Sequence, residues 1–214
     1  MEPFRRLEAA AVPLPQPNID TDRIIPARFL GRLRGVDHAP FLFHDARRLP
    51  GSGDEDPAFP LNRPEWRAAR IVVAGRNFAC GSSREAAVWA LHDHGVRCAV
   101  APSFGDIFRN NAVKNGLLPV VLPAEAVADL LAQLEARPGA AVAVDLPAQA
   151  VTFPDGASHG FDIDPFDKRC LLEGLDELAY TLSLADEIAA FERRMGRENA
   201  PFCNGPLVVN PLER

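Results

Sequence analysis

Apolar runs alternate with segments of helical periodicity through the middle of the chain. Consecutive apolar, largely β-branched residues predict buried strands at residues 71–74, 97–101 and 117–122. A helix is predicted after each of them, and the clearest, at residues 123–137, has one apolar stripe made of Val127, Leu130, Leu131 and Leu134. This alternation of strands and helices predicts an α/β fold with a largely parallel sheet flanked by helices.

The two ends of the chain have a different pattern. Residues 4–14 predict a weak strand that ends among prolines. After Pro138-Gly139, three short strands are expected to form a second small sheet on the same core, at residues 141–146, 150–153 and 158–163. A short helix is predicted at residues 165–173, and another begins near Ser183. We expect one domain over residues 1–197 and a Pro- and Gly-containing tail over residues 198–214.

Composition narrows the functional classes. The formal net charge of −6, with no basic stripe, argues against nucleic acid as a partner. No secretory signal is evident, and no apolar run approaches the ~20 residues of a membrane helix, so we expect a cytoplasmic protein without membrane contact. His38 and His44 lack partners at metal-ligand spacing. The cysteines are far apart and show no C-x-x-C pairing, which predicts no metal site within this chain; they are Cys80, Cys98, Cys170 and Cys203.

Residues 71–91 (IVVAGRNFACGSSREAAVWAL) concentrate the candidate chemistry. A strand, a Gly-containing loop and a helix start follow one another, and such a helix terminus attracts anions through its unpaired N–H groups. Ser82 and Glu85 have the spacing of a capping box, which would explain both as helix structure. It does not explain Ser83, or Arg84, whose cation opposes the helix dipole but whose fork suits a carboxylate. Capping and anion binding both remain open.

Two upstream segments allow similar pairs of interpretations. Residues 18–26 (NIDTDRIIP) are typical of turns closed by their own side chains, or alternatively of a loop that presents Asp22 and Arg23 to a site. Residues 27–35 (ARFLGRLRG) are basic, which indicates either a solvated face or a loop over an anionic ligand.

Three stretches together carry a resemblance to a known family. They are residues 18–30 (NIDTDRIIPARFL), 77–91 (NFACGSSREAAVWAL) and 101–122 (APSFGDIFRNNAVKNGLLPVVL). In this order the chain resembles the small subunits of 3-isopropylmalate dehydratase, relatives of the swivelling C-terminal domain of aconitase. The resemblance covers nearly the whole chain except the tail, and it implies a three-layer β/β/α swivelling domain.

The resemblance also implies a function and a partner. Members of the family are hydro-lyases of leucine biosynthesis that isomerise 2-isopropylmalate to 3-isopropylmalate by dehydration and rehydration. They act with a large subunit that holds a [4Fe-4S] cluster through its own cysteines, so this chain would bind no cofactor itself. By the family motif, Ser82 is the base, Arg84 holds a substrate carboxylate of the dicarboxylate, and Ser83 lies beside it. The stretch that discriminates substrates by side chain is Phe29, Leu30, Gly31 and Arg32.

Two departures from the family pattern keep alternatives open. Ala86 stands where many relatives have histidine within Arg-Glu-His-Ala-Pro-Trp, which puts that histidine's supporting contacts in doubt. Gly31 leaves room for an isopropyl group, whereas Arg32 could pair with the extra carboxylate that a homoaconitase substrate carries. A homoaconitase or related hydro-lyase subunit is therefore the alternative, and a non-catalytic anion-binding module is an alternative of another class.

Overall fold

The computed structural model describes residues 1–198, in two compact units. The first unit, Met1–Asp176, contains the sheet and all the candidate site residues. The second begins at Glu177 and contains the helices α6 (Glu177–Ser183) and α7 (Ala185–Glu198). The predicted domain over residues 1–197 spans both units, and residues 199–214 of the predicted tail lie outside the described residues.

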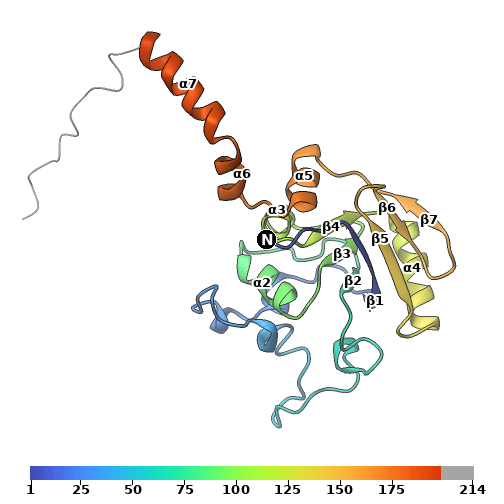
Figure 1. Ribbon diagram of the computed structural model, residues 1–214. Coiled ribbons are helices and arrows are strands. Elements are labelled where there is room, and N and C mark those ends of the chain that lie inside the picture. Colours follow the sequence, from blue (N-terminus) through green and yellow to red (C-terminus); the bar gives the residue numbers. More distant parts are fainter. Residues whose placement is uncertain (199–214) are drawn as a thin grey trace, which may run out of the picture. The chain divides into compact units, whose positions relative to one another are not determined.

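The first unit is built on one seven-stranded sheet with the order β4-β3-β2-β1-β5-β6-β7 (Figure 1). The strands are β1 (Arg6–Leu14), β2 (Ile71–Ala74), β3 (Cys98–Ala101), β4 (Leu118–Val121), β5 (Ala141–Asp145), β6 (Ala150–Thr152) and β7 (Ser158–Gly160). β1 to β4 pair in parallel, and β5 to β7 extend the sheet by antiparallel pairing.

The expectation of a second, separate small sheet is wrong. β1 is nine residues long and pairs with two neighbours along different parts of its length. Its residues Ala11–Leu14 pair in parallel with β2, whereas its residues Arg6–Ala10 pair antiparallel with β5. The late strands therefore continue the same sheet.

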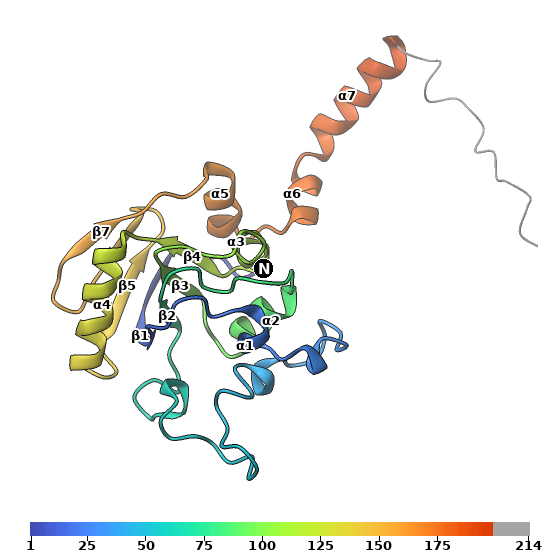
Figure 2. The ribbon, with the colours of Figure 1, turned by 180° about the vertical axis from the view of Figure 1, so that it is seen from behind.

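Helices cover both faces of this sheet, as the opposite views of Figures 1 and 2 show for α2 and α4. The helices of this unit are α1 (Thr21–Ile24), α2 (Glu85–Asp93), α3 (Asp106–Lys114), α4 (Ala124–Ala136) and α5 (Pro165–Glu173). Alternate residues of β2 enter two cores: Val72 packs in the cluster that contains α2, and Val73 in the cluster that contains α4. The predicted α/β fold with flanking helices is confirmed. None of the helices within residues 1–198 combines the length and apolar character needed to cross a bilayer.

A long irregular segment joins α1 to β2 and contains only the short 3-10 helices η1 (Ala27–Phe29), η2 (Ala39–Phe41) and η3 (Pro60–Asn62). The buried Asn62 side chain ties it together. Its Nδ2 donates to the carbonyls of Arg47 at 2.7 Å and Asp56 at 2.8 Å, and its Oδ1 accepts from Arg47 Nε at 2.8 Å. This amide therefore adds side-chain hydrogen bonds to the turn bonds of the segment's own backbone.

Candidate functional site

The candidate site lies where loops leave the carboxyl ends of neighbouring parallel strands, the usual place for ligands in such sheets. The loop after β2, residues 75–84, is here called the serine loop. It is fastened to the segment after β1 by backbone bonds from Ala79 N to Ile19 O at 2.6 Å and from Thr21 N to Cys80 O at 2.9 Å. The buried Thr21 hydroxyl also donates to the carbonyl of Ser82 at 3.0 Å. Thr21 therefore holds the backbone of the predicted base.

The segment after β3 fastens the other side of the serine loop. Asn77 N donates to Ser103 Oγ at 2.9 Å, and Gly105 N donates to the carbonyl of Phe78, also at 2.9 Å. Gly105 is needed for this approach, because a Cβ at its position would lie 2.5 Å from the carbonyl oxygen of Ala79. The serine loop is thus held from both sides.

Within the serine loop the backbone has three left-handed residues: Asn77 at φ 60°, Ala79 at φ 56° and Gly81 at φ 90°. Positive φ is costly for an alanine, so the contacts that flank Ala79 must supply the stabilisation. Such strain is common where a loop presents side chains to a ligand.

The serine loop presents Ser82 and Ser83 to solvent. An open pocket of about 220 Å³ lies beside them. It is lined by Ala79, Gly81, Ser82, Gly105, Asp106, Ile107 and Phe108. The Ser82 hydroxyl forms no hydrogen bond with another side chain or backbone group within residues 1–198, so it is available to a ligand.

The capping box that the spacing of Ser82 and Glu85 left open is not formed. α2 begins at Glu85, its N-cap is Arg84, and no side chain caps it. The Glu85 carboxylate accepts instead from Asn115 Nδ2 at 2.9 Å. Because Thr21 holds the Ser82 carbonyl, residues 82 and 83 stay outside the helix and the serine hydroxyl is not used as a cap.

The Arg84 guanidinium turns toward α1, where its Nη1 forms an ion pair with the Asp22 carboxylate. The Arg84 side chain is 13% exposed and that of Asp22 54%, so the pair lies at the edge of the surface. Both interpretations of residues 18–26 hold in part. Asp20 closes a local turn by accepting from Arg23 N at 2.7 Å, whereas Asp22 reaches the site.

The predicted discriminating residues, 29–32, follow α1 in the chain, where the backbone leaves the core. Phe29 stacks on Phe41 with ring centroids 4.5 Å apart, and the Arg32 guanidinium lies 4.6 Å from the centre of the same ring. Leu30 is half-buried, whereas Gly31 and Arg32 are exposed. Within residues 1–198 no hydrogen bond or ion pair joins residues 29–32 to residues 82–84, so α1 is the element that connects the two groups.

Sequence reasoning missed the residues that support this site. Thr21 and Gly105 act on residues 61 and 26 positions away in the chain, and no local pattern indicates such contacts. The only available signal was their place in stretches that follow buried strands.

The cysteines of the described chain do not fit a metal cluster. Cys98 is fully buried in β3, where burial raises the pKa of its thiol, Cys170 is buried in α5, and Cys80 lies in the serine loop. Within residues 1–198 no three His, Cys, Asp or Glu side chains gather as metal ligands would. Cys203 lies outside the described residues.

Two protein families and several known proteins are similar to this chain. The family described as "Aconitase C-terminal domain" matches residues 1–125, and a second, "LeuD_N", matches residues 128–165. The 3-isopropylmalate dehydratase small subunit of Paramagnetospirillum magneticum is 52% identical over 192 residues, which is 90% of this chain and 95% of that protein. The one from Parvibaculum lavamentivorans is 49% identical over 202 residues, 94% of this chain and 100% of that protein.

A solved structure agrees with these relatives. The crystal structure of 3-isopropylmalate dehydratase from Methanocaldococcus jannaschii has a TM-score of 0.62 and 26% sequence identity, and the match covers 87% of this chain and 99% of that one. The chain belongs to the family of 3-isopropylmalate dehydratase small subunits.

Proposed function

We propose that this chain is the catalytic small subunit of a 3-isopropylmalate dehydratase. With a large subunit that carries a [4Fe-4S] cluster, it would isomerise 2-isopropylmalate to 3-isopropylmalate in leucine biosynthesis. One observation carries the proposal beyond the family match: an exposed serine and a guanidinium are held on one open edge by the loops after β1, β2 and β3. The cluster would act from the large subunit, since the cysteines within residues 1–198 do not fit it.

Arg84 is the group proposed to bind a substrate carboxylate. Its Nη1 already forms an ion pair with the carboxylate of Asp22, which supports a role in binding such a group. A substrate carboxylate would take the place of Asp22, whose half-exposed side chain is free to turn outward. The bidentate fork would then orient the substrate relative to the serine loop.

Ser82 is proposed to remove the proton from the carbon next to the bound carboxylate. As the C–H bond breaks, negative charge builds on that carboxylate, so Arg84 binds the transition state more strongly than the ground state. The same guanidinium favours an ionised serine oxygen, because a nearby cation lowers the free energy of an anion. Ser83, equally exposed, would contribute a hydroxyl to the substrate.

The experiment is to mix the chain anaerobically with its large subunit and to assay 2-isopropylmalate, homocitrate and citrate. We expect the chain alone to be colourless and inactive, and the pair to prefer 2-isopropylmalate. Preference for homocitrate would assign the chain to the homoaconitase alternative, in which the exposed Arg32 pairs with the extra carboxylate. A reconstituted pair inactive on all three substrates would contradict the proposal.

A further inference from the structure

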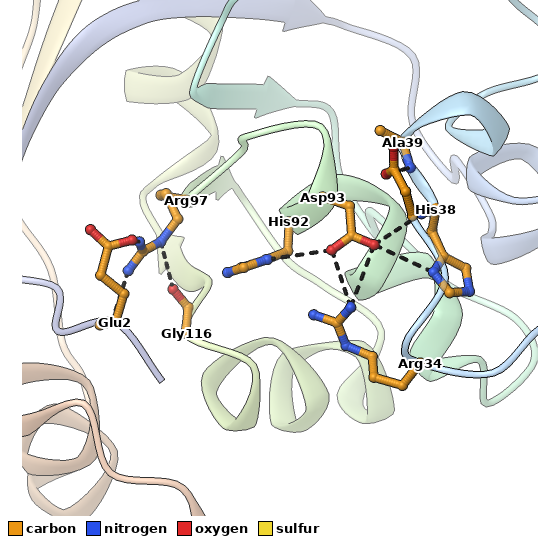
Figure 3. Close-up of polar contacts among 9 residues, drawn as sticks. Glu2, Arg34, His38, Ala39, His92, Asp93, Arg97 and Gly116 are labelled. Carbon is orange, nitrogen blue, oxygen red and sulfur yellow. Dashed lines mark hydrogen bonds and ion pairs between the residues drawn. The ribbon is translucent and has the colours of Figure 1, made fainter.

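The carboxylate of Asp93 gathers an unusual number of polar contacts at the last residue of α2 (Figure 3). It accepts from the backbone N–H of His38 at 3.0 Å and from Arg34 Nη1 at 3.2 and 3.4 Å. The ring nitrogens Nδ1 of His38 and of His92 lie 3.3 and 3.7 Å from it. Only 14% of the Asp93 side chain is exposed, so these groups replace water around the carboxylate.

These contacts keep Asp93 charged in spite of its burial. Burial alone would raise the pKa of this carboxyl, but the N–H group of His38 and the Arg34 guanidinium outweigh it and lower the pKa below its usual range. A partly buried carboxylate that accepts several charge-assisted bonds is a strong fastening point for the backbone that supplies them.

The backbone fastened in this way is the end of the segment of residues 27–38, here called the loop, which contains the predicted discriminating residues 29–32. Residues 31–37 are all exposed, and Leu33 is 81% exposed, so the middle of the loop has little packing of its own. His38, by contrast, is fully buried, and its ring meets the ring of Trp89 at 5.3 Å. The Arg34 guanidinium lies 5.6 Å from the centre of the same indole.

The loop is therefore held at two ends. At its beginning Phe29 stacks on Phe41, and at its end His38 and Arg34 are bound to Asp93. The middle of this segment makes few contacts of its own, so the two held ends supply most of the restraint on its conformation.

We propose that Asp93 is a positioning residue for substrate discrimination, which fixes residues 27–38 so that residues 29–32 face the substrate side chain. The inference rests on the proposed function, which supplies the role of residues 29–32. α2 then has two tasks: Arg84, the residue just before its first turn, would bind a carboxylate, while Asp93 at its end fastens the loop. A nine-residue helix spans about 14 Å and is stiff, so both groups keep a constant separation.

The first test reads the loop in the chain alone, without any activity. Trp89 is one of two tryptophans, so Trp66→Phe leaves it as the only indole. In that background Asp93→Asn keeps an acceptor for the His38 N–H but removes the charge that holds Arg34. We expect a red shift of the Trp89 emission and stronger quenching by acrylamide. Asp155→Asn is the matched control, because that carboxylate lies in the turn between β6 and β7, where it accepts from Ala157 N and from Gln133 Nε2 of α4.

The second test uses the chain reconstituted with its large subunit. We expect Asp93→Asn to raise KM for 2-isopropylmalate about tenfold, from the loss of a charge-assisted contact, with a smaller change in kcat. The preference for 2-isopropylmalate over 2-methylmalate should fall with it. If Asp93→Asn does not fold, Arg34→Gln gives the same test from an exposed side chain, with effects in the same direction.

The outcomes separate this inference from the proposed function. Unchanged Trp89 fluorescence, or an unchanged ratio of kcat/KM for the two malates, would overturn the role of Asp93 while wild-type activity stands. If the wild-type pair fails to convert 2-isopropylmalate, the proposed function fails, and the Trp89 measurement still decides whether Asp93 fastens the loop. A purely structural role would lower kcat for both malates equally and leave their ratio intact.

Discussion

Replacement of Ser82 by alanine separates the chemistry of the serine loop from its folding. The Ser82 side chain is exposed, and its hydroxyl makes no hydrogen bond within residues 1–198. The contact that fastens this residue runs from Thr21 Oγ1 to its carbonyl, which alanine retains. We therefore expect the free energy of unfolding to change by less than about 0.5 kcal/mol. If Ser82 is the base, kcat should fall by roughly 10²- to 10⁴-fold.

The assay is steady-state turnover of 2-isopropylmalate by the reconstituted pair, beside urea unfolding of the small subunit alone. Ser83→Ala is the matched control, since it removes an equally exposed hydroxyl one residue away. That control should raise KM more than it lowers kcat, as expected for a group that binds substrate. Ser82→Ala with more than half of the wild-type kcat would refute the assignment of the base. A large loss of stability would refute the claim that the hydroxyl has no structural role.

Two further predictions concern the support of the site and its surroundings. Gly105→Ala should lower the free energy of unfolding by about 1–3 kcal/mol, because its Cβ would meet the Ala79 carbonyl at 2.5 Å and displace the serine loop. Thermal unfolding measures this effect. The control is Gly35→Ala, whose Cβ meets nothing within 4 Å. Burial, and next the charge of Arg47, lower the pKa of His94 below its usual value of 6.5. The unfolded state therefore binds the proton of this histidine more readily than the folded state. The free energy of unfolding should keep its full value above about pH 6.5 and fall as the pH drops below it. Urea unfolding above and below pH 6.5 should show that the free energy of unfolding depends less on pH in His94→Phe than in the wild type. An equal dependence in the two proteins would contradict the role of burial.

The sheet's parallel half and its helices could be predicted because each carries its own local signal. β2 and β3 are buried on both faces and are therefore continuously apolar, which is visible in the residues themselves. α4 packs on one side only, so its Val127, Leu130 and Leu134 keep helical spacing. The serine loop could be singled out as a candidate site because its Gly-Ser-Ser-Arg run is local, and its role stays a prediction.

What could not be predicted depends on distant partners. The joining of β5 to β1 could not be predicted, because Arg6–Ala10 of β1 and Ala141–Asp145 of β5 lie far apart in the chain and no local pattern indicates that they pair. The choice between capping and anion binding could not be made from the spacing of Ser82 and Glu85 alone. Thr21 and Asn115, which engage the Ser82 carbonyl and the Glu85 carboxylate, lie far away in the chain. The contacts of Asp93 could not be predicted either, because His38 and Arg34 lie 55 and 59 positions before it in the chain.

The Asp22–Arg84 ion pair bears on why a partner subunit is needed at all. An arginine whose side chain is only 13% exposed would be strongly destabilising without an anion beside it, and Asp22 supplies one in the chain alone. If Arg84 binds the substrate as proposed, substrate binding exchanges one carboxylate for another, so the free energy gained at Arg84 is the difference between two similar pairs. Such a difference is small, and the affinity for substrate must come largely from contacts made elsewhere. This argument predicts weak binding of 2-isopropylmalate to the small subunit alone, and it assigns the remaining affinity to the large subunit.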